Sequence, residues 1–518
     1  MEANLFARIE TAVADLHSVC ISTPDGDKIA YKELFERTGQ VANALVSMGL
    51  RPGDRLAAQV EKSVAAIVLY LATIRAGGVF LPLNTAYTPH EIEYFLGDAE
   101  PTLFVCDPRA EAVLSPVASA AGAVVKTLDS TGQGSLEEEA SIQDRTFETV
   151  PRAADDLAAM LYTSGTTGRS KGAMLTHNNL FSNANTLRDA WRFSEQDVLI
   201  HALPIFHTHG LFVAINVSFL AGAQIILLDK FDPNEVIRQM PKATVLMGVP
   251  TFYVRLLEDA RIDRALTDRM RLFVSGSAPL LEETHRSWHE RTGHMILERY
   301  GMTETNMNTT NPYEGERMGG TVGKALPGVE VRIADPDTGL PVTDNQIGMI
   351  EVRGPNVFKG YWKMPERTAA EFRSDGFFIT GDLGKIDHNG YIRIVGRGKD
   401  LIITGGYNVY PKEVESEIDL IDGVLESAVI GLPHADFGEA VTGVIVLRAG
   451  SSLDGADVLA RLAGRLAKYK QPKKVVFVKQ LPRNTMGKVQ KNVLRETYAD
   501  LYSGNKVISS EVEPSLSS

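Results

Sequence analysis

The sequence has few cysteines and no excess of basic residues, and each absence excludes a class of protein. Its 518 residues contain only Cys20 and Cys106. These cysteines are too far apart for a CxxC pair, so a metal knuckle and a disulfide framework are excluded and a reducing compartment is expected. Lys and Arg number 53 against 65 Asp and Glu, a net charge of −12. Such a chain lacks the basic face that nucleic acids and anionic membranes attract.

Signals for export or membrane insertion are also missing. The N-terminus, MEANLFARIE, is acidic and amphipathic, without the basic start and apolar core of a signal peptide. The most apolar stretch, residues 211–228, is interrupted by Asn216, Ser218, Gly222 and Gln224. A membrane span tolerates few such groups, so we expect buried helix and strand there. We therefore predict a soluble, cytoplasmic protein that contacts neither membranes nor nucleic acids.

The pattern of expected strands and helices changes twice along the chain, which predicts an α/β protein of several lobes. Up to about residue 300, β-branched runs alternate with amphipathic segments, such as a helix expected at 31–48; this alternation favours two αβ-layered subdomains with parallel sheets. After about Gly315, short strands separated by Gly, Asp and Asn turns predict a small β-barrel-like subdomain. From about Asp400, strands and helices predict a compact α+β domain.

The segment YTSGTTGRSKGA, from Tyr162 to Ala173, is the strongest local motif. Hydroxyl side chains, three glycines and two cations lie in one turn after the expected strand AAMLY. Such a loop suits a polyphosphate, because unhindered backbone N–H groups and hydroxyls can surround the anion. It is not a Walker A loop, since Lys171 follows a serine and precedes a glycine. A dinucleotide GxGxxG motif is absent, because Leu401 stands where the third glycine belongs.

Two histidine pairs do not form convincing metal sites. His285 and His289 are four residues apart on an expected helix, but the glutamate of a zinc protease helix is missing between them. We interpret both as solvated polar residues. His207 and His209 lie between apolar runs with no acidic third ligand nearby, and we expect them to line a pocket.

Several single residues suggest nucleotide chemistry only in combination with the loop. Glu304 is a candidate Mg²⁺ ligand, because Mg²⁺ is usually held by one or two carboxylates and phosphate oxygens. Asp382 follows an expected strand, where its carboxylate suits ribose hydroxyls, and Arg397 lies at the end of the next strand. Lys488 follows a glycine near the end of the last domain. Taken alone, these residues fit capping or solvated surface positions equally well.

Together, these segments resemble the adenylate-forming superfamily of acyl-CoA synthetases, luciferases and peptide-synthetase adenylation domains. The resemblance extends over residues 1–502, and its motifs occur in order: TSGTTGRSKG, PIFHTHGLF, ERYGMTET, TGDLG, GRGKDLIITGGYNVYPKEVE and PRNTMGK. Longer passages, including YLATIRAGGVFLPLNTAYT, YGMTETNMNT and LPRNTMGKVQKNVLRETY, further resemble the rhizobial-type malonyl-CoA synthetases.

The resemblance implies an AMP-forming acid–thiol ligase that uses ATP, Mg²⁺ and coenzyme A. A carboxylate attacks the α-phosphate of ATP to give acyl-AMP and pyrophosphate, and the CoA thiol then attacks the acyl-AMP carbonyl. Carried onto this chain, the catalytic residues are Lys488, which bridges the α-phosphate and the carboxylate, His207, Glu304 and Arg397. Thr163 and Glu304 are the implied metal ligands.

The resemblance also assigns nucleotide-binding residues along the whole chain. The implied set comprises Thr163, Ser164, Gly165, Thr166, Thr167, Gly168 and Lys171 at the phosphates, Gly276, Ser277, Ala278, Glu298, Arg299, Tyr300, Gly301, Met302 and Thr303 around the adenine and acyl phosphate, and Asp382 and Arg397 at the ribose.

The resemblance implies a large N-terminal domain over residues 1–398 and a mobile cap over residues 399–502. Lys399 is the implied hinge, at a position where many relatives have aspartate. Gly405 and Gly406 are the implied lining of the CoA channel. The polar tail, residues 503–518, is expected to be disordered. Lys488 is in a context that resembles acetylated sites, and acetylation by a lysine acetyltransferase would remove its charge and stop adenylation.

Malonate carries a second carboxylate, which needs a donor when it is buried. The candidate malonate-binding residues are His209, Arg255, Ser277 and Arg286, although Arg255 fits a surface position on a short helix equally well. Alternatives to a malonyl-CoA synthetase are a ligase for methylmalonate, acetate or an aryl acid, and a non-catalytic ATP-binding relative. An adenylation domain that serves a carrier protein has no support, because no carrier domain follows residue 502.

Overall fold

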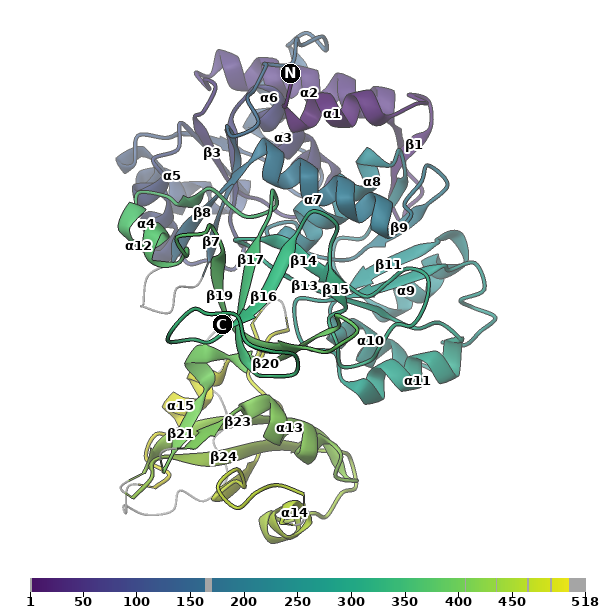
Figure 1. The fold of residues 1–518 in the computed structure, drawn as a ribbon. Coiled ribbons are helices and arrows are strands. Elements are labelled where there is room, and N and C mark those ends of the chain that lie inside the picture. The colour runs from purple at the N-terminus through teal and green to yellow at the C-terminus, as the bar shows by residue number, and fades with distance from the viewer. Residues whose placement is uncertain are drawn as a thin grey trace. The chain divides into compact units, whose positions relative to one another are not determined.

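The computed structural model divides the chain into two compact units, whose elements are labelled in Figure 1. The residues it describes are 2–163, 170–405, 407–434, 436–463, 465–484 and 487–502. The large unit comprises the described residues of Met1–Asn345, Ile350–Thr380 and Ile386–Arg393. The small unit comprises those of Gln346–Met349, Gly381–Lys385 and Ile394–Ser518.

One sheet of the large unit has the strand order β18-β8-β7-β4-β3-β5-β6. Its strands are β3 (Arg55–Gln59), β4 (Val79–Pro82), β5 (Leu103–Cys106), β6 (Val124–Thr127), β7 (Leu157–Thr163), β8 (Lys171–Thr176) and β18 (Gly360–Tyr361). Strands β3 to β7 pair in parallel, whereas β8 is antiparallel to β7 and to β18. The accompanying helices are α2 (Tyr31–Ser47), α3 (Val64–Arg75), α4 (Pro89–Ala99), η1 (Pro108–Ala110), α5 (Glu111–Ala120) and α6 (Ser135–Ser141).

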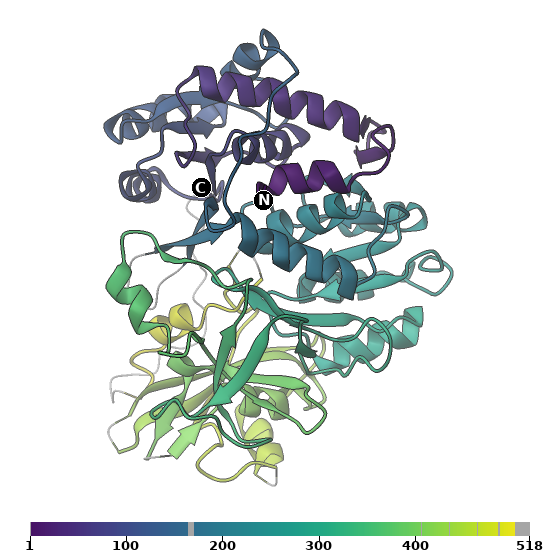
Figure 2. The ribbon, with the colours of Figure 1, turned by 45° about the horizontal axis from the view of Figure 1, so that its top comes forward.

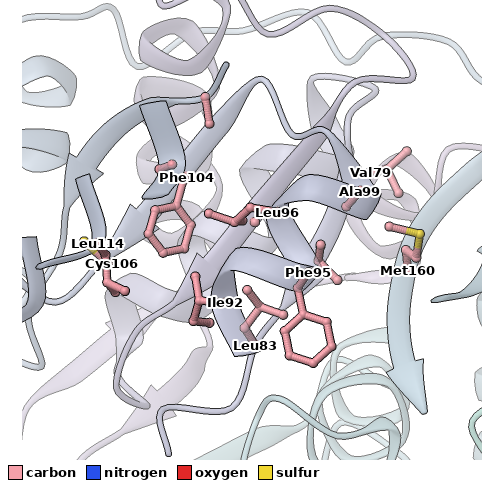
Figure 3. Close-up of a cluster of buried hydrophobic side chains, with 14 residues drawn as sticks. Val79, Leu83, Ile92, Phe95, Leu96, Ala99, Phe104, Cys106, Leu114 and Met160 are labelled. Atoms are coloured by element: carbon pink, nitrogen blue, oxygen red, sulfur yellow. The ribbon is translucent and has the colours of Figure 1, made fainter. Parts of the chain in front are cut away.

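The core of this lobe forms where α4 covers the sheet. Ile92, Phe95 and Leu96 on one stripe of α4 pack with Phe104 of β5 and Met160 of β7 (Figure 3). The i, i+3, i+4 spacing of the three helical residues places them on one face. Thr88 caps the helix in a capping box with Glu91, which fixes its start against the sheet.

The second sheet of the large unit has the order β15-β14-β13-β12-β11-β9-β10-β1-β2. Its strands are β1 (Val19–Ser22), β2 (Lys28–Ala30), β9 (Val198–His201), β10 (Gln224–Leu227), β11 (Val245–Gly248), β12 (Leu272–Ser275), β13 (Leu297–Met302), β14 (Asn306–Thr310) and β15 (Lys324–Ala325). The helices around it are α1 (Leu5–Ala12), α7 (His177–Ala190), η2 (His209–Ile215), α8 (Asn216–Leu220), α9 (Pro233–Gln239), η3 (Met240–Lys242), α10 (Pro250–Leu257) and α11 (Glu282–Thr292). Figure 2 shows the purple N-terminal helices α1 and α2 from a second side.

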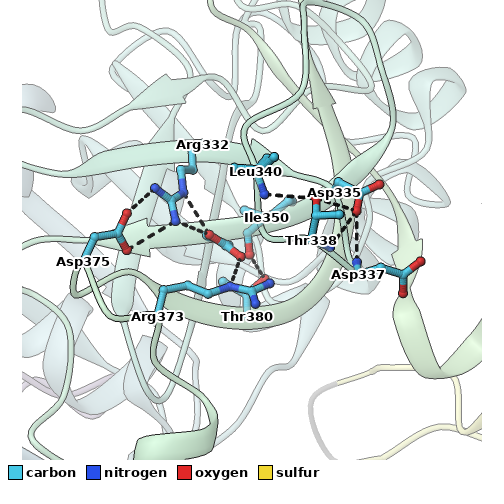
Figure 4. A network of polar contacts seen from close by, with 10 residues as sticks. Arg332, Asp335, Asp337, Thr338, Leu340, Ile350, Arg373, Asp375 and Thr380 are labelled. Atoms are coloured by element: carbon cyan, nitrogen blue, oxygen red, sulfur yellow. Dashed lines mark hydrogen bonds and ion pairs between the residues drawn. The ribbon is translucent and has the colours of Figure 1, made fainter.

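A further sheet has the order β16-β17-β19-β20. Its strands are β16 (Glu330–Ala334), β17 (Gly348–Arg353), β19 (Phe378–Ile386) and β20 (Ile392–Arg397), and α12 spans Pro365–Ala370. A charged network joins its strands (Figure 4). Glu351 is fully buried and accepts hydrogen bonds from Arg332 and Arg373, each at 2.8 Å, while Arg332 also pairs with Asp375. Two guanidinium groups thus compensate the burial of one carboxylate.

The small unit is an α+β fold with its own core. Its sheet has the order β22-β21-β24-β23, and β25 pairs with β24. The elements are η4 (Gly398–Asp400), β21 (Ile402–Thr404), β22 (Tyr407–Val409), α13 (Pro411–Asp419), β23 (Val424–His434), β24 (Gly438–Leu447), α14 (Gly455–Leu462), β25 (Lys474–Phe477) and α15 (Lys491–Thr497). Val414 and Ile418 of α13 pack on Val429 of β23 and on Val441 and Ile445 of β24.

The predicted fold class is confirmed, with differences at element ends. The helix expected at 31–48 ends one residue early, at Ser47; Met48 is its C-cap, and the next residue, Gly49, has a φ of 104°. The apolar stretch 211–228 forms buried helix and strand as expected. In the small unit, α14 begins at Gly455, directly after the Asp454 side chain that caps it, and ends at Leu462. Within the described ranges, no helix is long and apolar enough to cross a membrane.

Asp419, at the end of α13, gives the small unit a stability that depends on pH. Its Oδ1 accepts a 2.7 Å hydrogen bond from Ser427, and burial raises its pKa from 3.8 to about 6. Between these two values the folded chain holds more protons than the unfolded chain, so stability falls as pH rises from about 4 to about 6. We expect Asp419→Asn to stabilise the small unit by about 1–3 kcal/mol at pH 7.5, with little gain at pH 4.

Hydrogen exchange of peptides from α13 and β23 would measure this effect at the two pH values. Asp422→Asn is the matched control, because Asp422 is exposed in the same unit. Equal protection of the Asp419→Asn variant and the wild-type protein at pH 7.5 would contradict the expectation.

Candidate functional site

The predicted metal ligands come together at the end of β7. Thr163 is the last residue of that strand, and its hydroxyl donates to Glu304 Oε1 over 3.2 Å. Glu304 follows β13 and is buried. A buried carboxylate beside a hydroxyl provides the hard oxygen ligands that suit Mg²⁺. Within the described ranges, no group of three or more His, Cys, Asp and Glu could hold a metal ion. A Mg²⁺ here would therefore need phosphate oxygens as further ligands.

Tyr361 and Glu371, which the sequence did not suggest, lie beside the predicted metal ligands Thr163 and Glu304. The Tyr361 hydroxyl lies 3.1 Å from Glu304 Oε1 and 2.7 Å from Glu371 Oε2. Burial, followed by the charge of Glu304, raises the pKa of Tyr361 well above its usual value, so the phenol stays protonated. Lys171 Nζ lies 3.0 Å from Glu371 Oε1 and 4.0 Å from the centroid of the Tyr361 ring. The passage NVFKGYWKMPE contains Tyr361, but no local pattern predicts these long-range contacts.

The loop between β7 and β8 is only partly described. Thr163 and Lys171 lie opposite each other in the β7–β8 register. The predicted phosphate-binding residues Ser164, Gly165, Thr166, Thr167 and Gly168 lie outside the described residues.

A buried cationic cluster forms beside β12 and β13. Arg299 is 2% exposed, and its guanidinium donates to Ser277 Oγ over 3.4 Å. Ser277 Oγ also lies 3.3 Å from His209 Nδ1. A Cβ at Gly276 would lie 2.4 Å from Arg299 Cζ, so only glycine admits the guanidinium at this point. Arg299 Nε, His209 Nε2 and Ser275 Oγ are buried without a hydrogen-bond partner in the described part of the chain. Such buried polar atoms are costly unless a ligand pairs with them.

The charge of this cluster resides on Arg299. Burial lowers the pKa of Arg299 to about 9, which leaves the guanidinium charged at neutral pH. Burial, followed by the charge of Arg299, lowers the pKa of His209 well below 6.5, so the imidazole is neutral there. His209 begins the π-helix η2, a rare element that is frequent at functional sites. His207 precedes it, half-buried, with its ring 4.8 Å from the Phe206 ring.

One expectation about surface and interior is wrong, and two stay predictions. Arg255, on the last turn of α10, and Arg286, on α11, are both exposed, and their assignment to malonate stays a prediction. The buried cation is Arg299, which the resemblance assigned to the nucleotide. His285 was expected to be solvated, but it is buried and its Nε2 lies 3.1 Å from the carbonyl of Ile296. His289 is exposed, as expected.

The other residues assigned to the adenine and acyl phosphate lie along β13 and after β12. Ser277 has a φ of 70°, a strained value for a residue with a side chain. Glu298 Oε1 accepts a hydrogen bond from the Leu280 N–H over 3.3 Å, which holds the segment containing Ala278. Gly301 lets the β14 backbone approach, because a Cβ there would lie 1.9 Å from Asn306 O. Glu298 and Tyr300 are buried, and Met302 and Thr303 are half-buried.

The remaining predicted residues belong to the small unit. Arg397 Nε lies 2.7 Å from Asp382 Oδ1, so the two predicted ribose ligands pair with each other. Lys399, the expected hinge, is exposed in η4. Gly405 has a φ of 57° in the turn after β21, whereas Gly406 lies outside the described residues. Lys488 has an exposed side chain, and its N–H donates to Asn484 Oδ1 over 2.9 Å.

Comparison with known proteins gives consistent matches over almost the whole chain. Malonate–CoA ligase of Arabidopsis thaliana is 34% identical over 503 residues, which cover 91% of this chain and 82% of the relative. Mitochondrial malonate–CoA ligase ACSF3 of Mus musculus is 35% identical, covering 91% and 89%. The crystal structure of ATP-bound MatB from Rhodopseudomonas palustris is 64% identical, covers 97% of this chain and 100% of that chain, and has a TM-score of 0.96.

The family models agree with this result and confirm the resemblance to adenylate-forming enzymes. The model described as AMP-binding enzyme matches residues 10–362, and the model described as AMP-binding enzyme C-terminal domain matches residues 413–488. The chain belongs to the AMP-binding enzyme family.

Proposed function

We propose that this protein is an AMP-forming malonate–CoA ligase, which converts malonate, ATP and CoA to malonyl-CoA, AMP and pyrophosphate. The observation that carries the choice of acid is the buried cluster of Arg299, Ser277 and His209. A monocarboxylic acid with an apolar tail would leave this guanidinium without a carboxylate from the ligand, with only the charge of the buried Glu298 as a described counter-charge. Removing one partner of a buried charge pair costs about 2–5 kcal/mol. Malonate supplies a second carboxylate to pair with the guanidinium. The likeness to malonate–CoA ligases and to MatB supports the same choice.

The first half-reaction joins a malonate oxygen to the α-phosphorus of ATP and releases pyrophosphate. We propose that Arg299 and Ser277 bind the distal carboxylate and thereby direct the proximal carboxylate to the phosphorus, a gain from positioning. Lys488 neutralises charge on the reacting groups. Thr163 and Glu304 would hold Mg²⁺, which supplies charge neutralisation at the phosphates when bound. Asp382 would accept hydrogen bonds from the ribose hydroxyls. Its carboxylate would then be shared between the ribose and Arg397, which pairs with it in this structure.

The second half-reaction transfers the malonyl group to sulfur. The CoA thiol attacks the carbonyl carbon of malonyl-AMP, the bond to the phosphate oxygen breaks, AMP leaves, and the thiol proton passes to solvent. We propose that His207 lines the acyl pocket during this step and that Gly405 and Gly406 admit the pantetheine arm, because neither has a side chain to obstruct it. Acetylation of Lys488 would affect the first step and leave the second.

Pyrophosphate release with a panel of acids tests the proposal. With malonate, methylmalonate, acetate and benzoate at equal concentration, we expect malonate to give the highest kcat/KM. Acetate and benzoate should be at least about tenfold slower, because each lacks the second carboxylate that would pair with Arg299. Methylmalonate retains both carboxylates and should rank second.

The outcomes separate the alternatives. Acetate as fast as malonate would identify a short-chain ligase without a requirement for the second carboxylate. ATP binding without pyrophosphate release from any acid would identify a nucleotide-binding relative that does not adenylate.

A further inference from the structure

The chain of contacts around Glu304 fixes the direction of its carboxylate. Thr163 donates to Oε1 over 3.2 Å, and the Tyr361 hydroxyl lies 3.1 Å from the same oxygen. Two hydroxyl groups thus converge on Oε1, while no described residue donates to Oε2. Among the described residues, the protein thus holds Oε1, and Oε2 is the oxygen that a cation could contact.

Tyr361 is itself held in place. Its backbone belongs to β18, where Tyr361 pairs with Ala173 of β8, and its hydroxyl lies 2.7 Å from Glu371 Oε2. The phenol carries a single proton, so it cannot donate fully to both carboxylates. The shorter contact is to Glu371, and a cation on Glu304 Oε2 would relieve the crowding of negative charge around the phenol.

Glu371 is fixed in turn by two cations. Lys171 Nζ lies 3.0 Å from Oε1, and Arg367, one helical turn before Glu371, pairs with the same oxygen. The Lys171 side chain is 9% exposed and lies 4.0 Å from the Tyr361 ring centroid. Its ammonium group is thus engaged with Glu371 and Tyr361, although its place in the sequence motif suggests a phosphate contact.

We propose that Tyr361 and Glu371 are positioning residues for the magnesium site and that Lys171 acts through them, by holding Glu371, and not by contacting the phosphates. The inference rests on the proposed function only in requiring that the protein binds ATP with Mg²⁺. Residues that orient a metal ligand typically change metal affinity 10–100-fold when they are altered.

Calorimetric titration of ATP, without any acid, separates positioning from general damage. ATP is titrated into the full-length protein with excess Mg²⁺ and, separately, with EDTA. The dissociation constant with EDTA, divided by the dissociation constant with Mg²⁺, measures how strongly the metal supports ATP binding. Tyr361→Phe keeps the ring and removes only the hydroxyl, and we expect it to reduce this ratio about tenfold while the EDTA value stays unchanged. Glu371→Gln should reduce the ratio in the same direction.

Tyr31→Phe is the matched control, because the Tyr31 hydroxyl is also buried and donates to a carbonyl, that of Ala223, over 2.7 Å. Its ratio should equal that of the wild-type protein. A ratio in Tyr361→Phe that is also unchanged would overturn the positioning role. Equal weakening with Mg²⁺ and with EDTA would overturn it as well, since a purely structural change affects both measurements.

Combining variants tests the role of Lys171. If Lys171 acts through Glu371 and Tyr361, Lys171→Met should reduce the ratio in the wild-type protein but add less than twofold in the Tyr361→Phe background. Lys171→Arg, which keeps a charge beside Glu371, should retain most of the wild-type ratio. If Lys171→Met and Tyr361→Phe instead reduced the ratio by independent factors that multiply in the double variant, Lys171 would contact the phosphates directly. That result would overturn the role proposed for Lys171. Failure of the wild-type protein to bind ATP under either condition would overturn the proposed function first.

Discussion

Lys488→Ala should reduce formation of malonyl-AMP by about 10²–10³-fold, the scale for removing one preorganised group that stabilises developing charge. Attack of a malonate anion on ATP brings negative groups together, so a cation matters most in this step. The second step begins from malonyl-AMP, in which the bond to phosphorus already exists. The variant should therefore convert supplied malonyl-AMP and CoA to malonyl-CoA at a rate within about threefold of wild type.

The two half-reactions can be measured separately by pyrophosphate release and by thioester formation from malonyl-AMP. Lys479→Ala is the control, because Lys479 is an exposed lysine of the same unit to which we assign no role. Equal loss of both half-reactions in Lys488→Ala would contradict the separate roles that we assign to the two steps.

The second large effect is expected for Arg299→Met, which keeps a side chain of similar length but removes the charge. The distal carboxylate would then be buried without its partner, and we expect kcat/KM for malonate to fall about 10²–10³-fold, within the range for breaking a buried charge pair. The dissociation constant of ATP should stay within threefold. The rate with acetate should not fall, because acetate has no second carboxylate to pair.

Arg255→Met is the matched control, since Arg255 is exposed on α10. It should leave kcat/KM for malonate within threefold of wild type. If Arg255→Met lost malonate turnover and Arg299→Met did not, the exposed arginine would be the carboxylate partner. If Arg299→Met weakened ATP binding and malonate use equally, Arg299 would belong to the nucleotide site.

The sequence was sufficient to predict the fold class, because strand and helix periodicity is a local property that repeats along the chain. The resemblance to adenylate-forming enzymes also named Thr163 and Glu304 as a pair, and their side-chain oxygens lie 3.2 Å apart. The sequence could not show which of the charged residues are buried. Glu298 and Arg299 are adjacent charged residues on a strand that is buried on both faces, a placement that a pattern of charges does not suggest.

The sequence also did not predict which distant segments contact each other. Tyr361 meets Glu304 across 57 positions, and Lys171 meets Glu371 across 200 positions. Each contact depends on where β18 joins the edge of a sheet at β8, which is a consequence of tertiary packing. The buried position of His285 was missed for the same reason. It lies on the amphipathic helix α11, whose orientation is set by neighbouring strands.

The missing side chain at Gly276 has a consequence for how acid preference evolves. The guanidinium of Arg299 occupies the space that any Cβ at this position would fill. A change from glycine to alanine requires a single base substitution, and it would displace the cation without altering any charged residue. If Arg299 binds the distal carboxylate, as we propose, preference for a dicarboxylate can be lost in one mutational step at a residue that contributes no functional group. Comparisons that follow only the charged positions around Arg299 would overlook this substitution.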